Sequence, residues 1–176
     1  MKKIVVATCM SLLAGGALAA DANEAVKVLM DMAASNAAVE PGSNAVYADY
    51  FAPGMLLGYF SDGFVRDFTT ALLKQKEGHS QLMIDWDPVL GGQDGCVPKD
   101  VTYGKPVTKG AVTEVLVSFK RSWCYDGDAE TKEEVTQVTY RLVEEGDEVG
   151  ENHFVIDDIH FVNDVPLRIS LHELAK

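Results

Sequence analysis

The sequence predicts an α+β fold in which N-terminal helices pack on a curved, four-stranded antiparallel sheet, giving a cone-like shape. Before Asp100 the apolar residues recur at helical spacing, and after it they alternate as in strands. No internal repeat or low-complexity linker follows residue 19. The remaining 157 of the 176 residues suit one domain. We therefore expect a single α+β domain over residues 20–176.

The first 19 residues have the layout of a cleavable signal peptide. Lys2 and Lys3 form a short positive segment, residues 4–18 carry no charge, and Ala17-Leu18-Ala19 is a cleavage motif. The uncharged stretch is shorter than the roughly 20 residues that span a membrane. Cys9 lies too early in it for lipid attachment. We expect a periplasmic or secreted protein that is soluble after cleavage and has no membrane span.

Two cysteines remain once Cys9 is removed. In an oxidising compartment an isolated pair favours a structural disulfide between Cys96 and Cys124 over a metal or catalytic site. The alternative is two buried free thiols.

The chain is acidic, with a formal charge of −12 that becomes −14 without Lys2 and Lys3. Such a surface repels nucleic acid and anionic lipid and attracts cationic partners. Solubility alone is the simpler explanation of the acidity. No nucleic-acid partner is expected, and the expected partner is an unknown protein or small molecule of the cell envelope.

Two helices are predicted in the first half of the chain. Residues 23–38 form an amphipathic helix that ends before Pro41, with an apolar face of Val26, Leu29, Met30 and Ala33. Residues 47–51 form a short aromatic segment closed by Pro53 and Gly54. Ser61 then caps the clearest helix, which stops near Lys76 and has an apolar face of Phe64, Val65, Phe68, Ala71 and Leu72.

Four strands are predicted in the second half, over residues 101–107, 112–123, 135–143 and 154–162. Turns are expected at residues 109–110, 126–128 and 144–150. The inward side chains are Val115, Val117, Phe119, Trp123, Val138, Tyr140 and Leu142.

In the last predicted strand, two apolar residues do not fit the alternation of inward and outward side chains. Ile156 and Ile159 would face opposite sides of a flat strand, and a bulge at Asp157-Asp158 would turn both inward and bend the strand. After it, the Ser-x-x-Glu pattern of Ser170 and Glu173 predicts a capping box and a single closing helical turn.

Several short motifs together resemble a family of exported bacterial domains of unknown function. They are Asp85-Trp86-Asp87-Pro88, Gln93-Asp94, Ile156-Asp157-Asp158-Ile159 and Ser170-Leu171-His172-Glu173-Leu174. That family looks like the nuclear transport factor 2 superfamily, the cystatin-like cone in which a curved antiparallel sheet folds over a long helix. The resemblance covers residues 46–176 and implies the fold. It supplies no catalytic residues, because the superfamily includes isomerases, dehydratases and hydrolases as well as binding proteins.

The most unusual segment is the loop of residues 85–94, which is rich in acidic and glycine residues. Its oxygen-bearing side chains could bind a hard cation or a polar ligand, although the spacing does not match a calcium loop. We favour a structural interpretation, in which Asp87 or Asp94 accepts backbone N–H bonds while Trp86 and Leu90 anchor the loop. The candidate binding residues of this loop are Asp85, Trp86, Asp87, Gln93 and Asp94.

Three further candidates lie on the strands. Asp157 and Asp158 could form an acid/base set with His160, but a bulge whose backbone donors bond one Asp is the favoured interpretation. Arg121 interrupts the apolar face of its strand, so it is either a pocket residue that pairs with a carboxylate or ligand, or an edge residue.

The sequence predicts no catalytic residues, metal site or cofactor. His79, His153 and His172 lack metal-ligand spacing, and no nucleophile motif is present. An aromatic cluster at the start of the long helix suits either the core or a pocket lining, namely Tyr50, Phe51, Tyr59, Phe60, Phe64 and Phe68.

Three functions remain open on the sequence. The favoured one is an exported ligand- or protein-binding module without catalysis. The alternatives are an acidic inhibitor or immunity-type protein against a basic secreted enzyme, and a small cone-fold enzyme with a pocket carboxylate.

Overall fold

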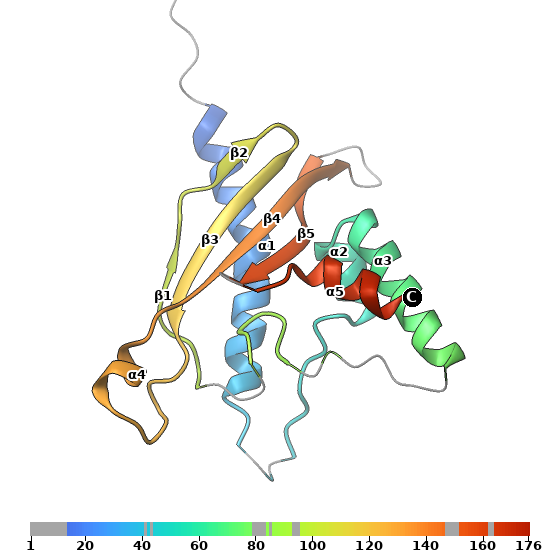
Figure 1. Cartoon of the computed structure of the whole chain (residues 1–176). Coiled ribbons are helices and arrows are strands. Elements are labelled where there is room, and N and C mark those ends of the chain that lie inside the picture. Colours follow the sequence, from blue (N-terminus) through green and yellow to red (C-terminus); the bar gives the residue numbers. More distant parts are fainter. Residues whose placement is uncertain are drawn as a thin grey trace, which may run out of the picture.

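The computed structural model describes residues 14–40, 42, 44–78, 84, 86–92, 96–146, 152–161 and 164–176, with side chains from residue 22 onward. Most of the predicted signal peptide lies outside these residues. The structure confirms the α+β class, with a long helix lying across one face of an antiparallel sheet (Figure 1). The cone-like curvature of that sheet stays a prediction.

The described sheet has five strands rather than the four predicted. β3 (Val112–Lys120), β4 (Thr136–Gly146) and β5 (Asn152–Phe161) form a meander, and both β1 (Lys99–Tyr103) and β2 (Val107–Lys109) pair with β3. The single strand predicted over residues 101–107 is thus divided. Pro106 lies in the break, and its ring nitrogen has no hydrogen to donate to the ladder.

Helix α1 (Ala14–Ala37) begins nine residues before the predicted Asn23 and so runs through the predicted cleavage position. Its predicted apolar face is confirmed, since Val26, Leu29, Met30 and Ala33 are all buried. These side chains share one core with the inward residues of β3 and β4, among them Val115, Val117, Phe119, Val138, Tyr140 and Leu142.

Helix α3 (Asp62–Glu77) is also confirmed, together with its cap. The Ser61 hydroxyl accepts a hydrogen bond from the backbone N–H of Phe64 at 2.9 Å. The backbone N–H of Ser61 donates to the carbonyl of Ile156 at 2.9 Å. The start of α3 is therefore attached to β5, and α2, α3 and α5 gather beside that strand (Figure 1).

The structure corrects three local predictions about helices. α2 (Pro53–Tyr59) begins where the sequence predicted a closing turn, and α4 (Ala129–Glu133) follows the predicted turn at residues 126–128. α5 (Leu167–Leu174) is longer than the single turn predicted and begins after Pro166. Ser170 lies inside α5, so the predicted capping box is wrong.

The predicted bulge in β5 is confirmed. Leu142 pairs with Ile156 and Arg141 with Asp158, which leaves Asp157 as the extra residue. As a result Ile156 and Ile159 are both buried.

The predicted disulfide joins Cys96 to Cys124, with Cα atoms 5.8 Å apart. It ties the segment before β1 to the chain that follows β3. Trp123, predicted to face inward, is 38% exposed instead. The reason is that β3 ends at Lys120, so the alternation no longer governs where Trp123 points.

Candidate functional site

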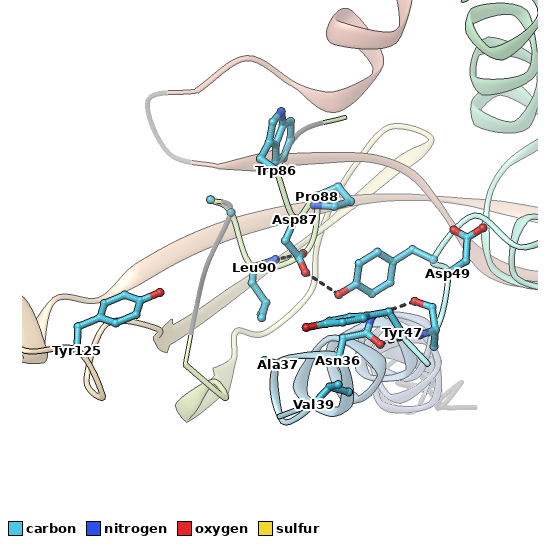
Figure 2. A pocket seen from close by; sticks show the side chains of 14 residues that line it. Asn36, Ala37, Val39, Tyr47, Asp49, Trp86, Asp87, Pro88, Leu90 and Tyr125 are labelled. Carbon is cyan, nitrogen blue, oxygen red and sulfur yellow. Dashed lines mark hydrogen bonds between the residues drawn. The ribbon is translucent and has the colours of Figure 1, made fainter. Parts of the chain in front are cut away.

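A pocket of about 660 Å³ opens where the end of α1 meets residues 47–50 and residues 86–92 (Figure 2). We call it the aromatic pocket. Its walls are mostly aromatic and aliphatic, with two carboxylates and one amide, and the residues that define it are Asn36, Tyr47, Asp49, Tyr50, Trp86, Asp87 and Tyr125. In Figure 2, Tyr125 and Asp49 lie at opposite ends of the group.

Asn36, in the last turn of α1, fixes one wall of the aromatic pocket. Its amide nitrogen donates to the carbonyl of Ala48 at 2.9 Å, and its amide oxygen accepts from the backbone N–H of Ala48 at 2.8 Å. The two bonds satisfy the backbone N–H and carbonyl groups of Ala48, as pairing with a neighbouring strand would otherwise do. An irregular segment is thus held against the helix by one buried side chain.

Asp87 fixes the opposite wall. One carboxylate oxygen accepts from the backbone N–H groups of Val89 and Leu90, both at 2.7 Å, and the other accepts from the Tyr50 hydroxyl at 2.8 Å. The first pair is the backbone interaction predicted for this loop. The third bond joins the loop to the segment that Asn36 holds. Burial, followed by the nearby Asp87 carboxylate, raises the pKa of Tyr50 well above its usual value, so its hydroxyl stays a donor.

The loop is anchored on its outer side by close packing. Trp86 meets Phe161 edge to face, with ring centroids 6.2 Å apart. Gly91 and Gly92 have positive φ angles of 70° and 93°. A Cβ atom at position 91 would also collide with the ring of Phe161, whereas at position 92 it would meet the movable guanidinium of Arg121, so the positive φ angle is the main reason for glycine there.

Arg121 lies just beyond the end of β3, against Gly92. Its side chain is half-buried, and no carboxylate of the described residues forms an ion pair with it. Its backbone carbonyl accepts from the N–H of Cys96 at 2.9 Å. Arg121 is therefore next to the aromatic pocket but is not part of its lining.

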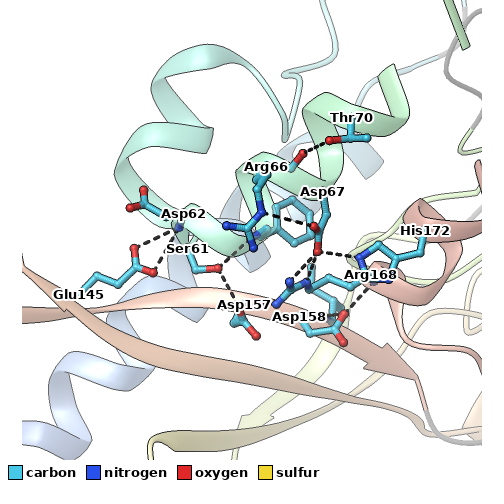
Figure 3. A network of polar contacts seen from close by, with 12 residues as sticks. Ser61, Asp62, Arg66, Asp67, Thr70, Glu145, Asp157, Asp158, Arg168 and His172 are labelled. Carbon is cyan, nitrogen blue, oxygen red and sulfur yellow. Dashed lines mark hydrogen bonds and ion pairs between the residues drawn. The ribbon is translucent and has the colours of Figure 1, made fainter. Parts of the chain in front are cut away.

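A second polar cluster joins α3, β5 and α5 (Figure 3). Arg168 donates from Nε to Asp67 at 2.8 Å and from Nη1 to Asp157 at 2.7 Å. Asp157 also accepts from the Ser61 hydroxyl at 2.7 Å, and His172 Nε2 lies 2.9 Å from Asp67. We call these five residues the Arg168 cluster. Because its polar atoms bond one another, we interpret it as a connection between elements.

Two carboxylates near Arg168 have shifted pKa values in opposite directions. Burial alone would raise the pKa of Asp67, but the hydrogen bonds from Arg168 and His172 together hold it below its usual value. Burial raises the pKa of Asp158, and the backbone N–H groups of Arg168 and Ile159 offset this only in part. The Asp158 carboxylate thus accepts backbone hydrogen bonds both at the bulge in β5 and at the start of α5.

The structure separates the predicted site residues into two groups. Trp86 and Asp87 line the aromatic pocket with Arg121 beside it, whereas Asp157 and Asp158 lie near α5. The predicted residues Asp85, Gln93 and Asp94 lie outside the described residues. His160 does not join the two acids, since its Nε2 lies 2.9 Å from the carbonyl of Asp164.

Sequence reasoning missed Asn36 and Arg168. Asn36 carried a weak signal, because a polar residue interrupts the end of an otherwise apolar helical face. Arg168 carried none, since its partners lie about 100 and 11 residues away along the chain.

Comparison with family models, curated proteins and solved structures finds no match to this chain. Within the described part of the chain, none of the helices is long and apolar enough to span a bilayer. The same residues contain no cluster of three or more histidine, cysteine or acidic side chains arranged to hold a metal ion.

Proposed function

We propose that this chain is an exported, periplasmic module that binds a small ligand in the aromatic pocket and catalyses no reaction. The observation that carries the proposal is the fixed geometry of the pocket walls. Asn36 and Asp87 hold two irregular segments in place through hydrogen bonds to protein atoms alone. A pocket that is already ordered loses little conformational entropy when a ligand enters, which favours binding.

The chemical character of the walls supports the same proposal. Small-ligand sites are concave and mostly apolar or aromatic, with a few polar groups that orient the ligand. The aromatic pocket has this composition, and its volume lies within the range of about 300–1,000 Å³ that such sites occupy.

Binding is favoured over catalysis by the way Asp87 is used, since the other carboxylate of the pocket, Asp49, is exposed to solvent. Asp87 accepts three hydrogen bonds from its own protein, and Asp49 accepts one from the N–H of Phe51 at 2.8 Å. A general base needs a lone pair aimed at the substrate proton, and Asp87 directs its oxygens at the loop and at Tyr50.

Export is supported by the disulfide between Cys96 and Cys124, because such bonds persist in oxidising compartments. We also propose the relation to the cone-like superfamily. The long helix across the sheet and the bulge in β5 support it, since a bulge bends the strand that carries it.

The test is a screen of small molecules for thermal stabilisation, with a variant that fills the aromatic pocket. Both bonds between Asn36 and Ala48 use the backbone of Ala48, so Ala48→Trp adds bulk to the pocket and keeps them. Ala111→Trp, at the exposed turn between β2 and β3, is the matched control. We expect at least one compound to raise the Tm of the parent and the control but not of Ala48→Trp. Equal stabilisation of all three proteins would overturn the proposal.

A further inference from the structure

A second pocket of about 450 Å³ lies directly beside the aromatic pocket. The two share four lining residues, Asp49, Tyr50, Trp86 and Pro88. Beyond these, the second pocket is lined only by apolar side chains, Phe51, Phe68, Leu72 and Ile84. We call it the apolar pocket. Because one set of residues borders both, the two pockets adjoin one another and together extend from the end of α1 to α3; we call the pair the groove.

The groove has two chemically different ends. At the α3 end, Phe51 packs on Phe68 with ring centroids 4.7 Å apart, and Leu72 is half-buried beside them. These side chains have no charged neighbour among the residues that line the apolar pocket, apart from the shared Asp49. This end therefore suits an aliphatic chain or a small ring.

The middle and the α1 end of the groove combine carboxylates with aromatic rings. Asp49 is exposed and borders both pockets, and its Oδ2 has no hydrogen-bond partner among the described residues. Tyr47 and Trp86 add aromatic surface to this part of the groove, and Tyr125 adds it at the end away from Asp49. The faces of such rings attract organic cations through their quadrupoles.

The charged residues that line the groove are all acidic. The residues that line its two pockets include Asp49 and Asp87 and no lysine or arginine. The guanidinium of Arg121 lies against Gly92 but is not part of the lining. The net charge of −12 on the whole chain adds a long-range attraction for cations.

We propose that this groove binds an amphiphilic organic cation, an ammonium group that carries an apolar chain. The ammonium head lies between Asp49 and the aromatic rings, and the chain lies against Phe68 and Leu72. This inference rests on the proposed function, which requires only that the aromatic pocket binds some small ligand. It adds the charge of the ligand and its extension into the apolar pocket.

The test uses hexyltrimethylammonium, with hexanesulfonate, hexanol and tetramethylammonium as matched probes. The protein has two tryptophans, so Trp123→Phe leaves Trp86, which borders both pockets, as the only indole reporter. Binding is measured by the emission of Trp86. We expect hexyltrimethylammonium to bind at least tenfold more tightly than hexanesulfonate. It should also bind more tightly than tetramethylammonium, by roughly fourfold for each methylene buried.

Two pairs of variants locate the head and the chain. Asp49→Asn should weaken binding of the cation several-fold and leave the affinity for hexanol unchanged. The control Asp126→Asn makes the same change in net charge at an exposed position, and it should leave the affinities for the cation and for hexanol unchanged. Leu72→Gln should weaken binding of hexyltrimethylammonium and of hexanol, and Leu57→Gln, at a side chain 80% exposed on α2, should weaken neither.

Equal affinity for the cation and the sulfonate, or an unchanged affinity in Asp49→Asn, would overturn this inference. The proposed function would stand in that case if another compound still stabilised the parent and not Ala48→Trp. If neither these probes nor any compound of the screen binds, both proposals fail.

Discussion

The Asp87 side chain accepts three hydrogen bonds that hold its loop in place. It binds two backbone N–H groups and the Tyr50 hydroxyl, so Asp87→Ala removes three hydrogen bonds and leaves their donors unpaired. We expect a loss of roughly 2–3 kcal/mol in the free energy of unfolding, measured by urea denaturation. Tyr50→Phe removes only the bond between segments and should cost about 1 kcal/mol. Equal costs for the two variants would contradict the assigned bonds.

Arg168 is the centre of its cluster, and a neighbouring arginine provides a control. Arg168→Gln removes the cation between Asp67 and Asp157, two carboxylates whose side chains are 12% and 19% exposed. We expect a loss of roughly 1–3 kcal/mol, less than for a fully buried pair because solvent still reaches the site. Arg66→Gln removes an arginine that is 72% exposed, and should cost under about 0.5 kcal/mol. If both variants unfold at the same urea concentration, the cluster does not stabilise the fold.

Asp67 gives the Arg168 cluster a pH dependence of known sign. Its pKa is lower in the folded state than the ordinary 3.8 expected of the unfolded chain. The carboxylate therefore stabilises the fold above about pH 4, and this contribution is lost as the pH falls through the folded pKa. We expect Asp67→Asn to be less stable than the parent at pH 7, with a difference that narrows below pH 4. Urea titrations at pH 7, 5 and 3 measure it, and a difference that widens in acid would contradict the sign.

The elements that the sequence predicted correctly are those that bury a periodic apolar face. The parity of Ile156 and Ile159 located the bulge in β5 because only one extra residue could turn both inward. α2 and α4 were missed because both are short and neither fully buries a residue, although Met55, Leu56 and Tyr59 of α2 pack against the edge of the core. Their local signals, Pro53 at the first turn of α2 and the Asp128 cap of α4, were interpreted as turns.

The disulfide acts on the connection between two elements. It closes a loop with a sequence separation of 28 residues, so its removal should destabilise the protein by roughly 3–4 kcal/mol in the chain-entropy model. The double variant Cys96→Ser/Cys124→Ser, compared with the oxidised parent in urea, measures this directly. The reduced parent should match the double variant. An unchanged midpoint on reduction would mean that the bond does not constrain the unfolded chain.

At the scale of the whole molecule, the fold class and the single apolar core could be predicted from the sequence, and the aromatic pocket could not. Its walls come mainly from residue 36, residues 47–50 and residues 86–92, which are brought together by the bonds between Asn36 and Ala48 and by the bond from Tyr50 to Asp87. Such bonds follow no periodicity. Trp86 and Asp87 were identified as candidates from local composition alone, without the segments that face them.

The proposed export predicts where the mature chain begins. We expect the processed protein in a periplasmic fraction to begin at Ala20, as determined by intact mass. Processing there leaves Ala22 and Ala25, both buried against the core, in place at the start of α1. A protein that retains Lys2 and Lys3 in the cytoplasmic fraction would contradict the export part of the account.

The most direct test of the proposed binding function is a ¹H–¹⁵N correlation spectrum of the processed protein, recorded against small cationic, anionic and neutral apolar compounds. We expect a compound that binds to shift the amide signals of residues 36–37, 47–50, 86–87, 89–92 and 125. The signals of Ser61, Asp157, Arg168 and His172, which lie away from both pockets, should stay in place. Shifts confined to other parts of the chain, or no shift with any compound, would contradict the proposed binding function.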